Sequence, residues 1–377
     1  MGTRGLPAAY GGFETFAQEL SARLVARGHS VTVFQRHAVT DGLLGFDAEP
    51  LGGVQRRSTA TVMHKYAETP LSSLSSFLDL FLGRVTRRRE FDVALLCNAA
   101  NSPFSFLAKL CRVPLAINVD GVERLRAKWN GAGKLWYRLG EQSSVWFADR
   151  IIADAKVIFD YYAERFAVSP AVITYGADPK PVASGETLSR FGVKAGRYLL
   201  YVSRFEPENN ALGVVQGYVR SGVTDVPLVM VGDAPYADEY KAKVRAAAAG
   251  ADERVIFTGF QFGEAYRELR SNCLGYIQAT EVGGTHPALV EGMAYGNAII
   301  ANAVPEHLEV LGDTGLYYPK NDFDELATLI AKLVADAQLR EQLGSAAARR
   351  AQQLFSWDSI TDKYEELLLD LCNRSES

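Results

Sequence analysis

The stretch from Gly275 to Asn297, GYIQATEVGGTHPALVEGMAYGN, decides the fold of this 377-residue chain. It opens with a short apolar run, Gly275–Ala279, which predicts a buried strand. A loop of small residues follows, and a helix is predicted to begin near Pro287, because proline suits the first turn, and to end at Gly296. A strand, a small-residue loop and a helix in this order form the repeating unit of an α/β sheet.

The same alternation of strands and helices extends along the whole chain. One helical stripe is formed by Phe13, Phe16, Leu20 and Leu24 and is closed by Gly28. The strand candidates are nearly continuous apolar runs, which is typical of strands buried on both faces. We therefore predict an α/β fold with parallel sheets and helices on both faces. The predicted strands, besides Gly275–Ala279, are Val31–Phe34, Asp92–Cys97, Leu115–Val119, Arg150–Ala153, Ala171–Tyr175, Tyr198–Ser203, Pro227–Gly232, Arg254–Thr258, Ala298–Ala301 and Gly315–Tyr318.

A polar segment near residues 178–190, DPKPVASGETLSR, divides the chain into two α/β halves of similar size. It carries two prolines and has no apolar periodicity, so we predict a linker there. Domains usually have about 100–200 residues, which favours two domains for this length. We predict a first domain over residues 1–178 and a second over residues 190–355.

Composition excludes several classes of protein. The net charge is -4, which argues against a nucleic-acid binder. The 4 cysteines are far apart and the 5 histidines form no HxH or HExxH pair, so we expect no disulfide framework and no metal site. No apolar run approaches the ~20 residues of a membrane-spanning helix, and the N-terminus does not resemble a signal peptide. We expect a cytoplasmic protein.

Charge is shared unevenly between the halves. Residues 1–178 hold 21 Lys/Arg and 17 Asp/Glu, a net charge of +4, and the remaining residues have 19 and 27, a net charge of -8. The basic clusters of the first half are either solvated helix faces or a face that lies on anionic lipid headgroups, where basic and interfacial aromatic residues cooperate. They comprise Arg84 and Arg87–Arg89, and Arg124, Arg126, Lys128, Lys134 and Arg138 interleaved with Trp129, Trp136 and Tyr137.

Two further segments, one rich in glycine and one a turn after a strand, are also candidate ligand-binding loops. Residues 2–15, GTRGLPAAYGGFET, form a loop in which Gly11 and Gly12 allow close backbone approach to a ligand, although many such loops simply turn the chain. Residues 201–210, YVSRFEPENN, place Arg204 at the carboxyl edge of a parallel sheet, where ligands bind. A guanidinium there suits a diphosphate, and the alternative is a structural ion pair.

Glu291 lies one turn into the helix predicted to begin at Pro287. The first-turn amides of that helix can hold a phosphate, and the carboxylate can accept hydrogen bonds from ribose hydroxyls. Alternatively, a carboxylate at this place only complements the helix dipole.

Four segments together resemble the retaining glycosyltransferases of family 4, and more narrowly the bacterial rhamnosyltransferases of cell-wall and capsular polysaccharide synthesis. The segments are GTRGLPAAYGGFET, NVDGVERLRAKW, SRFEPENN and VGGTHPALVEGMAYG. The resemblance implies the GT-B fold, which has two Rossmann-like domains with parallel sheets facing across a cleft. The first would bind the acceptor and the second the nucleotide sugar, and the last helix, residues 356–377, would pack back on the first domain.

The resemblance also implies a reaction. The enzyme would be a hexosyltransferase that moves L-rhamnose from dTDP-L-rhamnose, with retention, to a saccharide on an undecaprenyl diphosphate carrier, and it would lie peripherally at the inner face of the cell membrane. The alternatives are a different UDP- or GDP-sugar donor, or a non-catalytic protein that binds a nucleotide sugar. A dehydrogenase is not favoured, because no GxGxxG with a downstream acidic residue follows a strand.

Site residues follow from the matching positions. Arg204 matches the arginine on the donor diphosphate, Asn209 replaces the usual lysine, and Glu291 matches the glutamate that contacts the nucleoside sugar. The family's first glutamate falls on Gly283, so the backbone of Gly284, Thr285 and His286 would contact the donor sugar. The resemblance implies catalytic roles for Arg204 and for Asp120, which would orient the acceptor hydroxyl. Gly11 and Gly12 are also assigned to the donor. The residues assigned to the acceptor are Tyr10, Phe13, Glu14, Arg126 and Lys128. No metal or other cofactor is expected.

Overall fold

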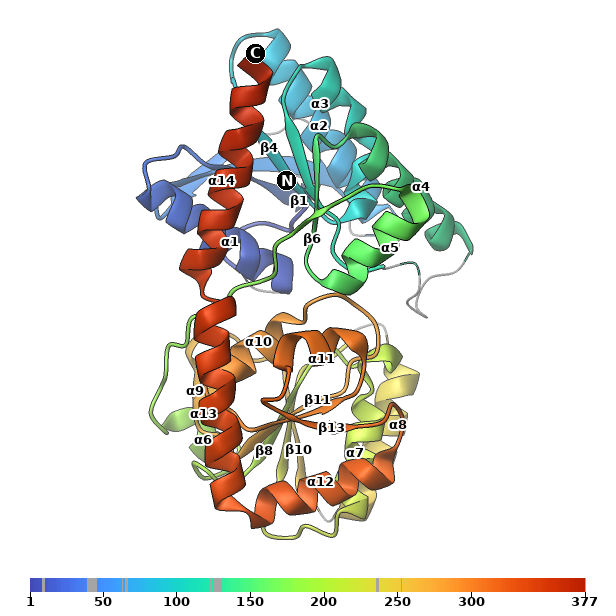
Figure 1. The fold of residues 1–377 in the computed structure, drawn as a ribbon, viewed down its shortest axis with the longest axis vertical. Coiled ribbons are helices and arrows are strands. Elements are labelled where there is room, and N and C mark those ends of the chain that lie inside the picture. The colour runs from blue at the N-terminus through green and yellow to red at the C-terminus, as the bar shows by residue number, and fades with distance from the viewer. Residues whose placement is uncertain are drawn as a thin grey trace. The chain divides into compact units, whose positions relative to one another are not determined.

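The computed structural model of the chain describes residues 1–8, 11–38, 46–62, 64, 67–122, 124, 131–234, 237–251 and 253–376. The chain divides into two compact units (Figure 1). Unit 1 comprises Met1–Tyr175 and Trp357–Ser377, and unit 2 comprises Gly176–Ser356. No described helix combines the length and the apolar character needed to cross a membrane.

Unit 2 is built on a 6-stranded sheet with the strand order β10-β9-β8-β11-β12-β13, and every pairing in it is parallel. In chain order the unit starts in the middle of the sheet, runs to one edge, returns to the middle and runs to the other edge. The order reverses between the neighbouring strands β8 and β11, and ligands bind at such a switch point in open α/β sheets. The strands are β8 (Leu199–Val202), β9 (Leu228–Val231), β10 (Val255–Gly259), β11 (Gly275–Gln278), β12 (Ile299–Asn302) and β13 (Leu316–Tyr318).

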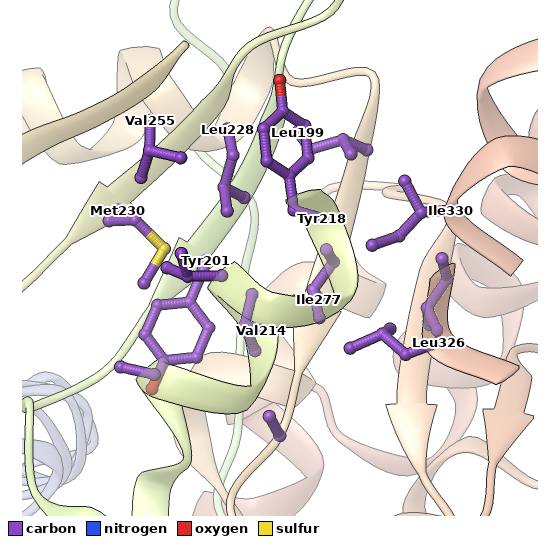
Figure 2. Packing of buried hydrophobic residues seen from close by; sticks show 14 of the residues in the cluster. Leu199, Tyr201, Val214, Tyr218, Leu228, Met230, Val255, Ile277, Leu326 and Ile330 are labelled. Atoms are coloured by element: carbon purple, nitrogen blue, oxygen red, sulfur yellow. The ribbon is translucent and has the colours of Figure 1, made fainter. Parts of the chain in front are cut away.

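Helices cover both faces of this sheet, because successive strand residues are apolar on both sides. Leu199 belongs to a core cluster with Val214 and Leu326, shown in Figure 2, whereas Leu200 belongs to a second cluster with Leu289. The helical elements are α6 (Glu186–Arg190), η4 (Pro207–Asn209), α7 (Ala211–Arg220), α8 (Asp238–Ala248), η5 (Ala249–Ala251), α9 (Gly263–Ser271), α10 (Pro287–Ala294), α11 (Pro305–Leu311), α12 (Phe323–Ala335) and α13 (Ala337–Leu354).

Unit 1 contains a 4-stranded parallel sheet, β4-β5-β6-β7, and a 3-stranded sheet, β1-β3-β2, in which only the β2–β3 pair is antiparallel. The first residues connect the sheets: Cys97 N donates to Met1 O at 3.0 Å, and Arg36 N donates to Arg4 O at 3.1 Å. The elements are α1 (Gly12–Ala26), β1 (Thr32–Ala38), β2 (Phe46–Leu51), β3 (Val54–Thr61), α2 (Glu68–Val85), β4 (Ala94–Cys97), η2 (Ala99–Phe104), α3 (Phe106–Leu110), β5 (Leu115–Asn118), α4 (Gly131–Phe147), β6 (Arg150–Ala153), α5 (Lys156–Phe166), β7 (Ala171–Val172) and α14 (Trp357–Glu376).

The last helix, α14, is part of unit 1 and packs on α1 (Figure 1). The Phe16 ring lies 5.1 Å from the Tyr364 ring and 6.2 Å from the Trp357 ring, centroid to centroid. At the edge of this contact, Arg27 Nη1 lies 2.5 Å from Glu365 Oε2. An apolar stripe with a charged margin therefore joins the two ends of the chain.

Each strand predicted from the sequence overlaps an observed strand, and the helix predicted from Pro287 is confirmed as α10. Two strands were missed, β2 and β3, which form the antiparallel hairpin of unit 1. The prediction of an unpatterned linker over residues 178–190 is wrong at its end, because Glu186–Arg190 forms α6. Glu268 stabilises this short helix, since its carboxylate accepts from the backbone N–H groups of Gly185 and Leu188 at 2.6 and 3.0 Å.

Candidate functional site

The loops that follow β8 and β11 meet at the switch point of unit 2. Glu281 N donates to Glu208 O at 2.8 Å, and Asn210 Nδ2 donates to Glu281 Oε1 at 3.1 Å. Lys320, which follows β13, adds an ion pair to Glu281 Oε2 at 3.0 Å. The two motifs that the sequence singled out, around Arg204 and around Glu291, are therefore carried by neighbouring loops of one sheet edge.

Arg204 lies at this edge with a partly exposed side chain. Its Nη1 is 3.7 Å from Glu206 Oε1, which is an ion-pair contact but longer than a hydrogen bond, and 35% of the side-chain surface is accessible. A guanidinium has five N–H donors in a planar fork, so this contact leaves donors for an anionic ligand.

Asn209, predicted to bind the donor, has a buried side chain directed at the loop itself. Its Nδ2 donates to Arg204 O at 2.7 Å, and its own carbonyl accepts from the hydroxyl of Tyr201 at 2.8 Å. Asn209 thus holds the backbone that carries Arg204, at the position where the family has a lysine.

The loop before α10 is shaped by Gly283 and His286. Gly283 has φ +153°, a conformation that favours glycine, and a Cβ there would lie 2.7 Å from His286 Nε2, so a larger residue would displace the imidazole. Thr285 is buried, and His286 is the residue that precedes the first turn of α10. The predicted donor contacts Gly284, Thr285 and His286 therefore stand at the N-terminus of a helix, where the macrodipole favours anions.

A second histidine, His307 on α11, fixes the protonation of His286. His307 Nδ1 lies 3.0 Å from the carbonyl oxygen of Asn302, which can only accept, so Nδ1 carries the proton and Nε2 is an acceptor. His286 Nδ1, 3.1 Å from that Nε2, is consequently the donor. Burial and the neighbouring His286 lower the pKa of His307 well below 6.5, so His307 stays neutral.

Glu291 lies one turn into α10 and contacts α9. Its Oε2 accepts a short hydrogen bond from the hydroxyl of Tyr266, and that hydroxyl accepts from Arg270 Nη2 at 2.9 Å. The carboxylate is therefore part of a polar chain that extends into the interior of unit 2.

In unit 1, Asp120 stands two residues beyond the end of β5. Its φ is +54°, in the left-handed region that is uncommon outside glycine and that concentrates at functional sites. Two contacts hold it there: Asp120 N donates to Asn118 Oδ1 at 3.0 Å, and the Tyr175 hydroxyl donates to Asp120 Oδ1 at 3.1 Å. Burial raises the pKa of Tyr175 well above 10, so this hydroxyl keeps its proton.

The predicted acceptor residues have diverse settings. Glu14 is buried and its Oε1 accepts from Arg4 N at 2.9 Å, so it holds the glycine-rich segment that leads to Gly11 and Gly12 at the start of α1. The Phe13 ring packs edge-on against the Tyr175 ring at 6.2 Å. Tyr10, Arg126 and Lys128 lie outside the described residues.

Among the residues that the structure describes, no group of three or more histidine, cysteine, aspartate or glutamate side chains is placed to hold a metal ion.

Comparisons with known proteins give the family. The family "Glycosyl transferases group 1" matches residues 190–350, and the family "Glycosyl transferase 4-like domain" matches residues 11–176. This chain is a group 1 glycosyltransferase with a family 4-like first half. The resemblance derived from its motifs is thereby confirmed at the level of the family.

Curated relatives of the glycosyltransferase are distant. A GDP-mannose-dependent α-(1-6)-phosphatidylinositol monomannoside mannosyltransferase from Mycolicibacterium smegmatis is 24% identical over 97% of each chain. O-antigen chain mannosyltransferase B from Escherichia coli is 24% identical, and the match spans only 54% of each protein. A D-rhamnosyltransferase from Pseudomonas aeruginosa is 26% identical over 55% of this chain and 56% of its own.

Solved structures confirm the fold. Sucrose-phosphate synthase from Thermosynechococcus elongatus superposes with a TM-score of 0.77 at 19% identity, covering 96% of this chain and 94% of that one. HepE from Anabaena, solved with UDP, has a TM-score of 0.73 at 18% identity and covers 97% and 98%. The expected GT-B fold is the fold of this glycosyltransferase.

Sequence reasoning missed Tyr266 and His307, which contact the predicted residues Glu291 and His286, and Arg270, which contacts Tyr266. Tyr266 and Arg270 are on α9, a helix whose polar composition is typical of a surface helix. The available signal was their spacing of four, which places both side chains on one helix face. His307 had no neighbour in sequence that would mark it.

Proposed function

We propose that this chain is a retaining hexosyltransferase that moves L-rhamnose from dTDP-L-rhamnose to a lipid-linked saccharide. The observation that carries the proposal is that the loop after β8, which bears Arg204, is hydrogen-bonded to the loop after β11, which leads to α10 and Glu291, at the switch point of unit 2. A guanidinium and a helix N-terminus suit a diphosphate, and a carboxylate one turn further suits a sugar hydroxyl. The acceptor is assigned to unit 1.

The proposed reaction is a displacement on the face that the leaving group departs from. The bond between the anomeric carbon and the diphosphate oxygen breaks, and a bond from that carbon to the acceptor oxygen forms on the same face. The acceptor hydroxyl gives its proton to the departing phosphate oxygen, and Asp120 orients that hydroxyl. Charge grows on the diphosphate in the transition state, so the fixed donors of Arg204 and α10 lower the barrier.

A UDP- or GDP-sugar donor is the second candidate. Two comparisons favour it: the structural neighbour HepE was solved with UDP, and one relative is GDP-mannose-dependent. A dTDP donor has no 2′-hydroxyl, so with dTDP the contact of Glu291 would have to be to the 3′-hydroxyl. The 3′-hydroxyl is common to all these donors.

Reversible binding of unit 1 to an anionic membrane surface would bring it to an undecaprenyl-diphosphate acceptor at the inner face of the cell membrane. The support is on α4, where Leu135, Leu139 and Trp146 are 67%, 43% and 60% exposed. Their spacing of four and seven places them on one helix face. Lys134 and Arg138 on the same helix are exposed, and this mixture suits a lipid headgroup layer. Arg124, by contrast, is paired with Glu141 at 3.1 Å.

The test is a transfer assay read by mass spectrometry. The purified protein is incubated with dTDP-L-rhamnose, UDP-glucose or GDP-mannose, each with undecaprenyl-diphosphate-linked saccharides, with and without EDTA. We expect a product that is heavier than the acceptor by one deoxyhexose residue, about 146 mass units, and only with dTDP-L-rhamnose; EDTA should not reduce the yield, because Arg204 and α10 supply the positive charge. Product from another donor alone would overturn the rhamnose assignment. Activity lost in EDTA and restored by magnesium would overturn the metal-free mechanism.

A further inference from the structure

The buried end of the polar chain beneath α10 is the guanidinium of Arg270. Arg270 is fully buried, 0% exposed, and its Nη2 donates to the hydroxyl of Tyr266 and to Ala288 O, each at 2.9 Å. The guanidinium also lies over the ring of Tyr276, 4.1 Å from the centroid, and 5.5 Å from that of Tyr266. A buried cation needs compensation, and aromatic faces give only part of it.

Only one assignment of donors and acceptors fits the hydrogen bonds that link Arg270, Tyr266 and Glu291. Arginine only donates and an ionised carboxylate only accepts, so the Tyr266 hydroxyl accepts from Arg270 and donates to Glu291 Oε2. Burial raises the pKa of Tyr266 well above 10, which keeps the proton on the phenol. The positive charge of Arg270 therefore acts on the carboxylate of Glu291 through one hydroxyl.

The helix itself is adapted to this arrangement at Gly292. A Cβ on Gly292 would lie 3.2 Å from Arg270 Nη1 and 3.0 Å from Cδ1 of Tyr276, both closer than ordinary packing. Glycine beside Glu291 thus makes room for the guanidinium under α10. An alanine would press on the guanidinium and on the Tyr276 ring while keeping the Tyr266 and Glu291 side chains themselves unchanged.

We propose that Tyr266 and Arg270 are positioning residues for Glu291, which hold its carboxylate in one orientation for a hydroxyl of the donor's nucleoside sugar. The inference rests on the proposed function and deepens it. A carboxylate has about four lone-pair sites, so the hydrogen bond from Tyr266 is compatible with a second one from the ligand. The role of the pair is to fix the direction of that second bond.

The experiment compares ligands that differ by one hydroxyl. Dissociation constants are measured by calorimetry for dTDP, UDP and GDP and for the 3′-deoxy counterpart of each. The 3′-deoxy ligand lacks the hydroxyl that would bond to the charged Glu291 carboxylate. The wild-type protein should therefore bind the nucleoside diphosphate for which it has the highest affinity on the order of tenfold more tightly than the 3′-deoxy counterpart of that ligand. Tyr266→Phe and Glu291→Gln should each reduce this preference to about twofold or less.

Tyr198→Phe is the matched control. Its hydroxyl is also buried and also bonded to α9, donating to Leu269 O at 2.6 Å, but it does not contact Glu291. It should keep the full preference for the 3′-hydroxyl, because a general loss of packing weakens both ligands alike. If Tyr266→Phe does not fold, Gly292→Ala takes its place and should also lose the preference.

The outcomes separate the two proposals. If Glu291→Gln loses the preference but Tyr266→Phe and Gly292→Ala keep it, the positioning role is wrong and the donor role of Glu291 stands. If wild type shows no preference for the 3′-hydroxyl, or if Glu291→Gln keeps the full preference, the role of Glu291 fails and the positioning role fails with it. If no nucleoside diphosphate binds wild type, the proposed function itself is overturned.

Discussion

Arg204 is the single arginine or lysine in the segment 201–210 after β8, and Asn209 stands where the resemblance implies a lysine. Asn209 donates to the carbonyl of Arg204 at 2.7 Å, so it holds the backbone of Arg204 in place but adds no positive charge. In the proposed reaction, stabilisation of the departing diphosphate would then depend on one guanidinium and on the N-terminus of α10. A site with fewer cations should depend more strongly on the one that remains.

Arg204→Ala should therefore lower turnover by about 10²–10³-fold, the usual effect of removing one fixed donor to developing charge. The matched control is Arg220→Ala on α7, which removes a surface arginine paired with Asp324 at 3.0 Å and should leave turnover within about twofold, as surface pairs contribute little. Steady-state kinetics check both variants. Turnover of Arg204→Ala above a third of the wild-type rate would exclude the diphosphate role.

His307 should make unit 2 sensitive to acid. Burial and His286 lower its pKa well below 6.5 in the folded protein, so below pH 6.5 the unfolded chain binds a proton that the folded chain does not. The contribution of neutral His307 to the free energy of unfolding is thus complete above pH 6.5. As the pH drops below 6.5, the free energy of unfolding decreases by up to about 1.4 kcal/mol per pH unit. In urea denaturation at pH 7.5 and 5.5, His307→Asn should show a smaller fall than wild type. Equal falls would contradict the neutral, buried state.

Residue types and their spacing predicted which side chains lie at this sheet edge, but not the direction in which those side chains point. Arg204 and Glu291 could be found because sheet edges and helix starts place such groups next to ligands. The backbone contact of Glu14 could not be predicted from its residue type, because a carboxylate in a first turn can contact either a ligand or the backbone, and here it accepts from Arg4 N. Arg270 was missed because an arginine on a polar helix is normally solvated, whereas this one lies under α10.

The end of β5 is the counterpart of this edge in unit 1. The strand is completely buried, and the chain turns sharply after it into the left-handed residue Asp120. Tyr175 and Asn118 fix the carboxylate and the backbone of that turn. A carboxylate held in a strained turn at a sheet edge suits the orientation of a substrate group.

Asp120→Asn should keep the turn, since asparagine tolerates the left-handed region, and should remove the negative charge. We expect turnover to fall by about 10²-fold, the scale of a lost orientation, with the dissociation constant of the nucleoside diphosphate unchanged. Asp160→Asn is the control, because Asp160 on α5 forms an exposed pair with Lys156 at 2.6 Å. Loss of diphosphate binding in Asp120→Asn would contradict the assignment of Asp120 to the acceptor side.

Periodicity predicted the elements that are buried on both faces and missed those that are not. The strands of unit 2 are apolar runs such as LVMV in β9, which read clearly. β2 and β3, FDAEPL and VQRRSTAT, carry charged and hydroxyl residues and pair in a hairpin, so no apolar run marks them. The burial of β3 comes from the packing of α2 on it, a contact between separate elements that local sequence does not encode, and the described residues of β2 stay mostly exposed.

At the scale of the molecule, the basic first half is expected to bind anionic vesicles. Arg89 is paired with Asp47 at 2.5 Å, whereas Arg87 and Arg88 are exposed after α2. Each basic residue near a lipid surface contributes about 1 kcal/mol, so Arg87→Ser with Arg88→Ser should weaken sedimentation with phosphatidylglycerol vesicles at low salt. Lys194→Ser with Arg197→Ser, an equal change of charge on exposed residues of unit 2, should not.

Salt gives the second arm of the vesicle experiment. Binding should decrease as ionic strength shortens the Debye length, to about 10 Å at 0.1 M. If wild type remains in the supernatant at low salt, the basic clusters are ordinary solvated faces. The lipid-linked acceptor would then lose its physical support.

The central claim is that the switch point of unit 2 binds a nucleoside diphosphate, and a crystal structure of the protein with dTDP tests it most directly. We predict the diphosphate at the N-terminus of α10 with its oxygens within hydrogen-bond distance of Arg204, and the 3′-hydroxyl on the carboxylate of Glu291. Diphosphate density away from both Arg204 and α10 would contradict the account.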